Sequence, residues 1–125
     1  MVPGARVPDD NFSWKEYLER ESGTTAPAGM PDPHAHHVLQ KRGRPGAQRD
    51  LVLEGQDLLQ RRAGIDPVYG LDNLVWAPNR VTAQHSTETL RRVVGKIREL
   101  DSANAAPQDF LKALEVLGKE AADRR

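Results

Sequence analysis

Three of the chain's four histidines lie within four residues, in the stretch His34-Ala35-His36-His37. The fourth, His85, follows much later, after the segment Trp76-Ala77-Pro78-Asn79-Arg80. Imidazole is the commonest metal ligand in proteins, and it is also the side chain best suited to transferring protons near neutral pH. The clustering therefore poses the question whether the two segments meet at one metal ion.

These residue types match what the hydrolysis of a phosphodiester bond requires. Attack by water builds charge on a phosphate that is already anionic, and a divalent metal ion stabilises that charge. A neutral imidazole can take the proton from the attacking water. His36, His37, Asn79 and His85 can supply metal ligands and a base, with arginines nearby. On residue type alone simpler roles stay open: the histidines as exposed or core residues, and Asn79 as a turn residue.

Length and composition describe one small domain with a modest core. The chain has 125 residues, of which 38% are apolar and 5% are aromatic, so the core must consist mostly of Leu, Val and Ala. Because the chain has no cysteine, disulfides and thiolate metal sites are excluded. No apolar run approaches the length of a membrane span, so we expect no membrane partner, and the first residues lack the basic and then apolar pattern of a signal peptide.

The charges are balanced overall but unevenly distributed along the chain. Residues 1–33 carry 3 basic and 6 acidic side chains, residues 34–98 carry 11 and 6, and residues 99–125 carry 4 and 6. The corresponding net charges are −3, +5 and −2, so both histidine segments lie in the basic part. A polyanion such as nucleic acid would be attracted to that part, although ordinary solvated faces would give the same count.

The first half of the chain is expected to hold a helix, a strand and a second helix. In the arm of residues 1–33, Ser13 can cap a short helix. Residues 36–40 favour a strand, and the basic loop of residues 41–46 is kept irregular by Gly and Pro. Leucines at helical spacing then predict a helix over residues 47–62.

The second half is expected to hold a strand and two helices. Residues 71–76 favour a strand that Pro78 stops, and Ser86 can cap a helix over residues 87–100. A last helix begins near Pro107, a residue well suited to a first turn. Its apolar stripe consists of Phe110, Leu111, Leu114, Leu117 and Ala121. This order of elements predicts an α+β fold that is mostly helical.

Four elements of the sequence, in this order, resemble those of a nuclease family. They are Ala35-His36-His37, Gly64-Ile65-Asp66-Pro67, the segment Asp72-Asn73-Leu74-Val75-Trp76-Ala77-Pro78-Asn79-Arg80, and His85 before a helix. Together they resemble the AHH/GHH-signature toxins of the HNH/endonuclease VII superfamily, which are His-Me finger (ββα-metal) nucleases. The resemblance covers roughly residues 30–100.

The resemblance implies a small ββα-metal core with flanking helices. It divides the chain into an N-terminal arm at residues 1–33 with one short helix, a nuclease core at residues 34–100, and a C-terminal helix at residues 101–125 that packs on the core. The zinc-finger-like cysteines of some HNH proteins are absent here, so no structural metal is expected.

The resemblance also implies roles for single residues. It makes His36 a metal ligand and His37 the general base that activates water. His85 would complete the metal site, with Asn79 as a rival or additional ligand. Asn73 resembles the asparagine that braces the loop through backbone hydrogen bonds.

The remaining candidates lie around these residues. Arg80 would be placed to contact phosphate, and Lys41 and Arg42 in the basic loop are further candidates for that contact. Neighbours on a strand face opposite sides, so His34 would share a face with His36. We therefore expect His34 at the edge of the site, either supporting a ligand or acting as an additional one.

Members of this family are typically C-terminal toxin domains that degrade the DNA of rival cells, and a dedicated immunity protein inhibits them. The resemblance thus implies a metal-dependent endonuclease that a dedicated secretion system delivers and that acts in the target-cell cytoplasm. Its divalent metal ion would be Mg, Mn, Zn or Ni. RNA is the alternative substrate, and a metal-stabilised module that binds nucleic acid or protein without cutting it is the alternative function.

Overall fold

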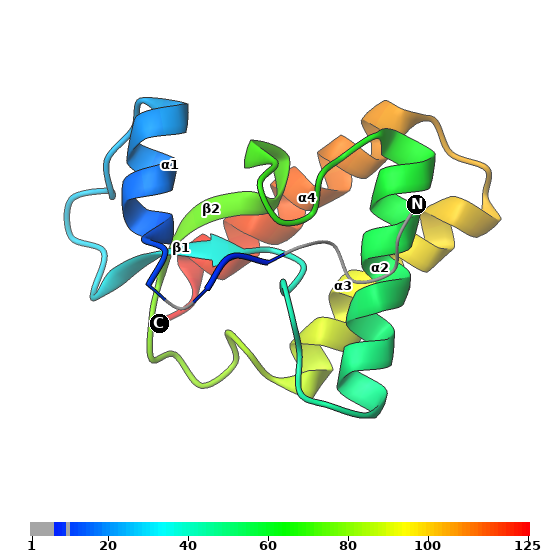
Figure 1. Ribbon diagram of the computed structural model, residues 1–125, viewed down its shortest axis with the longest axis horizontal. Coiled ribbons are helices and arrows are strands. Elements are labelled where there is room, and N and C mark those ends of the chain that lie inside the picture. The colour runs from blue at the N-terminus through cyan, green and yellow to red at the C-terminus, as the bar shows by residue number, and fades with distance from the viewer. Residues whose placement is uncertain (1–6, 10) are drawn as a thin grey trace.

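The computed structural model describes residues 7–9 and 11–125; residues 1–6 and 10 of the predicted arm lie outside the described residues. The described chain contains four α-helices and one two-stranded antiparallel sheet (Figure 1). In chain order these are α1 (Trp14–Ser22), β1 (Pro33–His37), α2 (Ala47–Ala63), β2 (Leu74–Pro78), α3 (Thr87–Ser102) and α4 (Pro107–Asp123). The predicted α+β, mostly helical class is confirmed. Among the helices of the described chain, none is both long enough and apolar enough to cross a membrane.

The helices begin and end at residues that satisfy their free backbone groups. The Ser13 hydroxyl accepts the Glu16 N–H at 3.2 Å ahead of α1, and the Ser86 hydroxyl accepts the Thr89 N–H at 3.1 Å ahead of α3. At the end of α2, Gly64 has a φ of 66°, in the left-handed region that glycine adopts without strain. Both predicted serine caps are confirmed.

Both strands lie a few residues away from their predicted ranges, 36–40 and 71–76. A side chain causes the shift: Asn73 Oδ1 accepts the Leu39 N–H at 2.8 Å, and Asn73 Nδ2 donates to the Leu39 carbonyl at 2.9 Å. The backbone of Leu39 therefore pairs with a side chain instead of a neighbouring strand, and β1 ends before it. A 3₁₀ turn at Leu71–Asn73 replaces the start of the second predicted strand.

The small sheet is covered by α1 on one face and by α4 on the other. The register pairs Ala35 with Trp76 and His36 with Val75. Ala35 and Trp76 belong to a buried cluster with apolar residues of α1. On the other face α4 approaches closely at Gly118, where an added Cβ would lie 2.8 Å from Val75 Cγ1. Because side chains alternate along a strand, His36 points to the α4 face.

The main core lies where α2, α3 and α4 pack together (Figure 1). Leu59, Val94 and Phe110, one from each helix, are almost completely buried there. The α4 stripe differs from its prediction at one position, because Leu111 is 38% exposed. Leu111 follows Phe110 directly, which turns it roughly 100° around the helix and away from the core. The rest of the predicted stripe is buried.

Candidate metal centre

Three histidine rings gather beside the sheet. His34 and His36 lie on the same face of β1, and His85 lies in the turn that precedes α3. One ring nitrogen of each histidine lies within 4.8 Å of the others. The ring centroids are 5.3 Å apart for His34 and His36, 5.3 Å for His36 and His85, and 5.8 Å for His34 and His85. The two histidine segments therefore meet in the folded chain.

The buried side chain of Gln84 holds the turn that carries His85. Its Nε2 donates to the carbonyl of Pro78 at 3.1 Å and to that of Ala121 in α4 at 2.8 Å. Its Oε1 accepts from Arg124 at 2.6 Å. The turn is thereby tied to the end of β2 and to the C-terminal helix. Gln84 is not among the site residues predicted from the sequence, where its only signal is its position next to the candidate ligand His85.

Two of the gathered imidazoles present buried nitrogens with no hydrogen-bond partner. His34 Nδ1–H donates to the Ala77 carbonyl at 2.9 Å, which fixes the tautomer and leaves the lone pair of neutral His34 on Nε2. His34 Nε2 and His36 Nδ1 are both buried and without a partner among the described residues. Buried polar atoms are nearly always paired, so these two nitrogens indicate a ligand. His34, expected at the edge of the site, lies inside the group.

The environment keeps the three imidazoles neutral near pH 7. Burial lowers the pKa of His36 to about 3, and the neighbouring His34 and His85 act in the same direction. Burial is also the main cause that lowers the pKa values of His34 and His85. A metal ion binds the neutral form of imidazole, so the group is in its binding state without having to release protons.

The group fits a divalent metal ion of borderline softness. Zinc–imidazole bonds are about 2.0–2.1 Å long, so two ligand nitrogens of a tetrahedral zinc ion lie about 3.4 Å apart. The three ring nitrogens lie within 4.8 Å of one another, so they would have to close in by up to roughly 1.4 Å to share one ion. Imidazole suits zinc and nickel, whereas magnesium prefers oxygen ligands. Three nitrogen donors leave a position for water or substrate on a four-coordinate ion.

His37, the next residue of β1, is held in a different way. Its Nε2–H donates to the Val68 carbonyl at 2.8 Å, so the lone pair of the neutral ring is on Nδ1. Its ring also meets the Trp14 ring edge-on, with centroids 4.5 Å apart. Burial is the main cause that lowers the pKa of His37 to about 4; the charge of Lys41 acts in the same direction, and the Val68 carbonyl opposes both. The ring is therefore a neutral proton acceptor at pH 7.

All four histidines line one cavity, although His36 and His37 face opposite sides of β1. The cavity has a volume of about 160 Å³. His37 is the last residue of the strand and lines the cavity together with His34 and His36. The lining residues are His34, Ala35, His36, His37, Gln40, Lys41, Arg42, Gly43 and His85. A proton acceptor and a metal-binding group therefore share one space with two cations, which we call the histidine cavity.

Asn73 braces the two segments that position His37. It binds both backbone groups of Leu39, just after β1, and its Nδ2 also donates to the Pro67 carbonyl at 2.7 Å. Pro67 directly precedes Val68, the acceptor of the His37 hydrogen bond. The side chain is completely buried, so these bonds are shielded from water. This geometry is what a loop-bracing asparagine requires.

Asn79 and Arg80 lie on the surface beyond the end of β2. The Asn79 N–H donates to the Asp32 carbonyl at 2.9 Å. The Arg80 side chain is 86% exposed and pairs with the Asp32 carboxylate at 3.2 Å. Neither residue lines the histidine cavity, whereas Lys41 and Arg42 do. The structure thus brings two of the three candidate phosphate contacts to the histidines, and the roles of Asn79 and Arg80 stay predictions.

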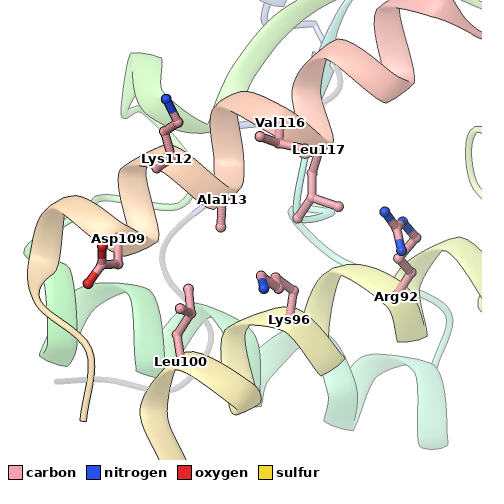
Figure 2. A pocket seen from close by; sticks show the side chains of 8 residues that line it. All are labelled: Arg92, Lys96, Leu100, Asp109, Lys112, Ala113, Val116 and Leu117. Carbon is pink, nitrogen blue, oxygen red and sulfur yellow. The ribbon is translucent and has the colours of Figure 1, made fainter. Parts of the chain in front are cut away.

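A larger cavity, of about 370 Å³, lies between α3 and α4 (Figure 2). Apolar side chains from both helices line it: Leu100 of α3 points toward Ala113 of α4, and Leu117 lies farther along α4 (Figure 2). Among the cations at its rim, Arg92 is bound to the Glu120 carboxylate at 2.5 Å. No histidine lines it, and it shares no residue with the histidine cavity. It therefore lacks the groups that hydrolysis needs.

Comparisons with known proteins add no identity. No family model matches the chain, and no curated protein or solved structure does either.

Proposed function

We propose that this chain is a metal-dependent endonuclease that hydrolyses phosphodiester bonds of DNA. One observation carries the proposal: His37, with its tautomer fixed, lines the same cavity as three other histidines, two of which have buried nitrogens without a hydrogen-bond partner among the described residues. A binding site for metal alone would not need a fourth histidine oriented in this way. The two cations in the same cavity suit an anionic substrate.

The residues of the chain would divide the work as follows. Lys41 and Arg42 attract the phosphate to the cavity by charge. His34, His36 and His85 would hold the metal ion, which when bound neutralises charge on the phosphate and stabilises the leaving oxygen. His37 Nδ1 accepts the proton of the attacking water, while the Val68 carbonyl keeps the ring oriented through Nε2.

The protonation state of His37 suits this role. Its pKa of about 4 leaves the ring neutral at pH 7, so that the lone pair is available. An anionic phosphate in the cavity favours the protonated ring, whereas Lys41 and a bound divalent ion favour the neutral ring.

The order of elements around the site supports a His-Me finger arrangement. Strand β1 carries His36 and His37, strand β2 pairs with it, and α3 begins directly after the turn that holds His85. The long helix α2 is inserted between the two strands. The divalent ion would be zinc or nickel rather than magnesium or manganese, given three imidazole donors.

The sequence elements that resemble the AHH/GHH-signature toxins also suggest a biological role for the proposed nuclease. We propose that the chain is a toxin domain that a dedicated secretion system delivers, that acts in the target-cell cytoplasm and that a cognate immunity protein inhibits. Expression in a host without the inhibitor would then be lethal, whereas expression of His37→Ala would be tolerated. Growth of the wild-type strain at the rate of the variant strain would overturn the toxin assignment.

Cleavage of plasmid DNA tests the proposed activity. The purified protein is stripped with a chelator and then given Mg, Mn, Zn or Ni, with plasmid DNA and a structured RNA as parallel substrates. We expect cutting of DNA with at least one ion, none in chelator and none by His37→Ala. Lys112→Ala, a change in the α3–α4 cavity, is the matched control and should cut like the wild type.

One alternative function has support from the same cluster. The three imidazoles come from β1 and from the turn before α3, so a metal ion would tie these segments together whether or not the chain cuts anything. A metal-stabilised binding module would gain thermal stability from zinc and leave both nucleic acids whole with every ion. That combination of results would overturn the proposed nuclease function in favour of the binding module.

A further inference from the structure

A second, smaller cavity adjoins the histidine cavity. It has a volume of about 130 Å³ and is lined by Pro8, Asp9, Phe12, Trp14, Lys41 and Arg42. Lys41 and Arg42 also line the histidine cavity, so the two spaces share a cationic wall. The other walls come from the N-terminal segment, and we call this space the arm cavity.

Pro8, in the described part of the arm, is hydrogen-bonded to the basic loop. The Arg42 guanidinium donates to the Pro8 carbonyl at 3.2 Å. The next residue, Asp9, closes a turn: its carbonyl accepts the Phe12 N–H at 3.2 Å and its carboxylate accepts the Asn11 N–H at 3.0 Å. The walls of the arm cavity are therefore held by hydrogen bonds of their own.

Aromatic rings form a continuous path from the proposed base to the arm cavity. The Trp14 ring lies edge-on to His37, with centroids 4.5 Å apart. The Phe12 ring in turn lies 4.6 Å from the Trp14 ring, at an interplanar angle of 60°. Both aromatic residues are only partly buried, and both line the arm cavity. Two aromatic side chains therefore line the arm cavity, and one of them, Trp14, contacts His37, the proposed general base.

The charged residues that line the two cavities suit different parts of a nucleotide, the phosphate in one and the base in the other. Lys41 and Arg42 line both cavities, whereas Asp9 lines only the arm cavity. A phosphate is therefore drawn to the shared wall and the histidines, and Asp9 makes the arm cavity less favourable for it. An uncharged ring with hydrogen-bonding edges suits the arm cavity, because it can stack on aromatic carbon and lie beside an acidic residue without repulsion.

We propose that the arm cavity binds an unpaired nucleobase of the strand whose phosphate lies at the histidines. Aromatic side chains beside a basic groove are the general means by which proteins hold single-stranded nucleic acid. In a duplex each base is covered by its neighbours and by its partner, so only an unpaired base can enter. The inference rests on the proposed nuclease function and deepens it, because it makes single-stranded or locally opened DNA the preferred substrate.

The test measures binding in chelator, where no cleavage occurs. A fluorescein-labelled oligothymidylate is compared with the same sugar–phosphate backbone carrying abasic sites throughout, and anisotropy gives both affinities. Stacking on aromatic side chains predicts that the wild type binds the strand with bases roughly 5- to 150-fold more tightly. Phe12→Ala should lose most of this preference, and Phe12→Tyr should keep it.

Controls separate stacking from charge and from misfolding. Leu111→Ala removes an exposed apolar side chain of α4, far along the chain from the arm, and should keep the wild-type preference. Equal affinity of the wild type for the two strands would overturn the proposal, and so would an unchanged preference in folded Phe12→Ala. Tighter binding of the strand with bases, without any cleavage in the plasmid assay, would overturn the nuclease function and keep the nucleobase site. Cleavage of plasmid DNA with equal binding of the two strands would overturn the nucleobase site and keep the nuclease function.

Discussion

The Nε2–H of His37 donates to the carbonyl oxygen of Val68 at 2.8 Å. The carbonyl directly before it in the chain, that of Pro67, accepts a hydrogen bond from Asn73 at 2.7 Å. One buried amide thus holds the loop that orients the imidazole. Because Nε2 is committed to a carbonyl, Nδ1 is the nitrogen of His37 that can accept a proton.

His37→Ala should abolish cleavage but leave the affinity for the metal ion unchanged. Loss of a positioned general base typically lowers a rate by roughly 10²- to 10⁴-fold. Zinc affinity should stay close to that of the wild type, because the metal-binding group consists of the other three histidines. Single-turnover cleavage and isothermal titration calorimetry measure the two effects. Full cleavage by the variant would remove His37 from the base role, and lost zinc binding would make it a ligand.

Asn73→Ala should destabilise the fold and weaken catalysis together. The change leaves the backbone groups of Leu39 and the Pro67 carbonyl without their partner inside the protein. A buried group without a partner costs roughly 1–3 kcal/mol, so we expect the free energy of unfolding to fall by roughly 3 kcal/mol. Urea denaturation in chelator measures this. Asn79→Ala, a surface change, should stay within roughly 0.5 kcal/mol of the wild type, and an equal loss in both would contradict the bracing role.

The helices could be predicted from the sequence more accurately than the strands. Helix ends are marked by local features such as Ser13 and Ser86, whose hydroxyls do accept the expected N–H groups. The strand ends depend on Asn73, which reaches Leu39 across 34 positions of the chain, and no local pattern announces that contact. This long-range contact by a side chain explains why β1 ends before Leu39, which the local sequence pattern could not predict.

Part of the candidate site could also be predicted from the sequence. The alternation of a strand places His34 and His36 on one face, but only the folded chain shows that His85 joins them both. The acceptor for His37 is a backbone carbonyl, which every residue possesses and which sequence therefore cannot distinguish. Gln84 is buried and hydrogen-bonded to Pro78, Ala121 and Arg124, and neither its burial nor these contacts follow from the local sequence.

Zinc titration of His34→Ala should separate a ligand from a supporting residue. Removing a residue that only supports a ligand typically lowers metal affinity by roughly 10- to 100-fold. We expect His34→Ala to lose more than about 100-fold, as His36→Ala does, because each contributes one of three gathered nitrogens. Asn79→Ala should bind zinc like the wild type. A loss in Asn79→Ala as large as in His34→Ala would instead bring Asn79 into the metal site.

The metal-free protein should lose stability as the pH falls below about 6.5. Burial lowers the pKa of His36 to about 3 and that of His37 to about 4, whereas both titrate near 6.5 in the unfolded chain. Between these values the unfolded state binds more protons, so the stabilisation is present above about pH 6.5 and declines toward the folded pKa values. From about pH 7 to about pH 5 each histidine should lower the free energy of unfolding by roughly 2 kcal/mol.

Urea denaturation in chelator at a series of pH values measures this dependence. His36→Asn should flatten the profile by about one histidine's share, because asparagine does not titrate. Lys112→Ala, whose side chain is exposed on α4, should leave the slope unchanged. A profile that is equally steep with and without His36 would show that other groups carry the acid sensitivity.

Gln84→Leu should weaken both the fold and the metal site, although Gln84 is not a candidate ligand. Leucine has a similar size but leaves the Pro78 and Ala121 carbonyls without their donor, which costs roughly 1–3 kcal/mol for each. The turn before α3 then loses its tie to β2 and α4, so His85 is held less firmly and zinc affinity should fall by roughly 10- to 100-fold. Gln108→Leu, an exposed change at the start of α4, should alter neither quantity. Wild-type zinc affinity in folded Gln84→Leu would mean that His85 reaches the metal without this anchor.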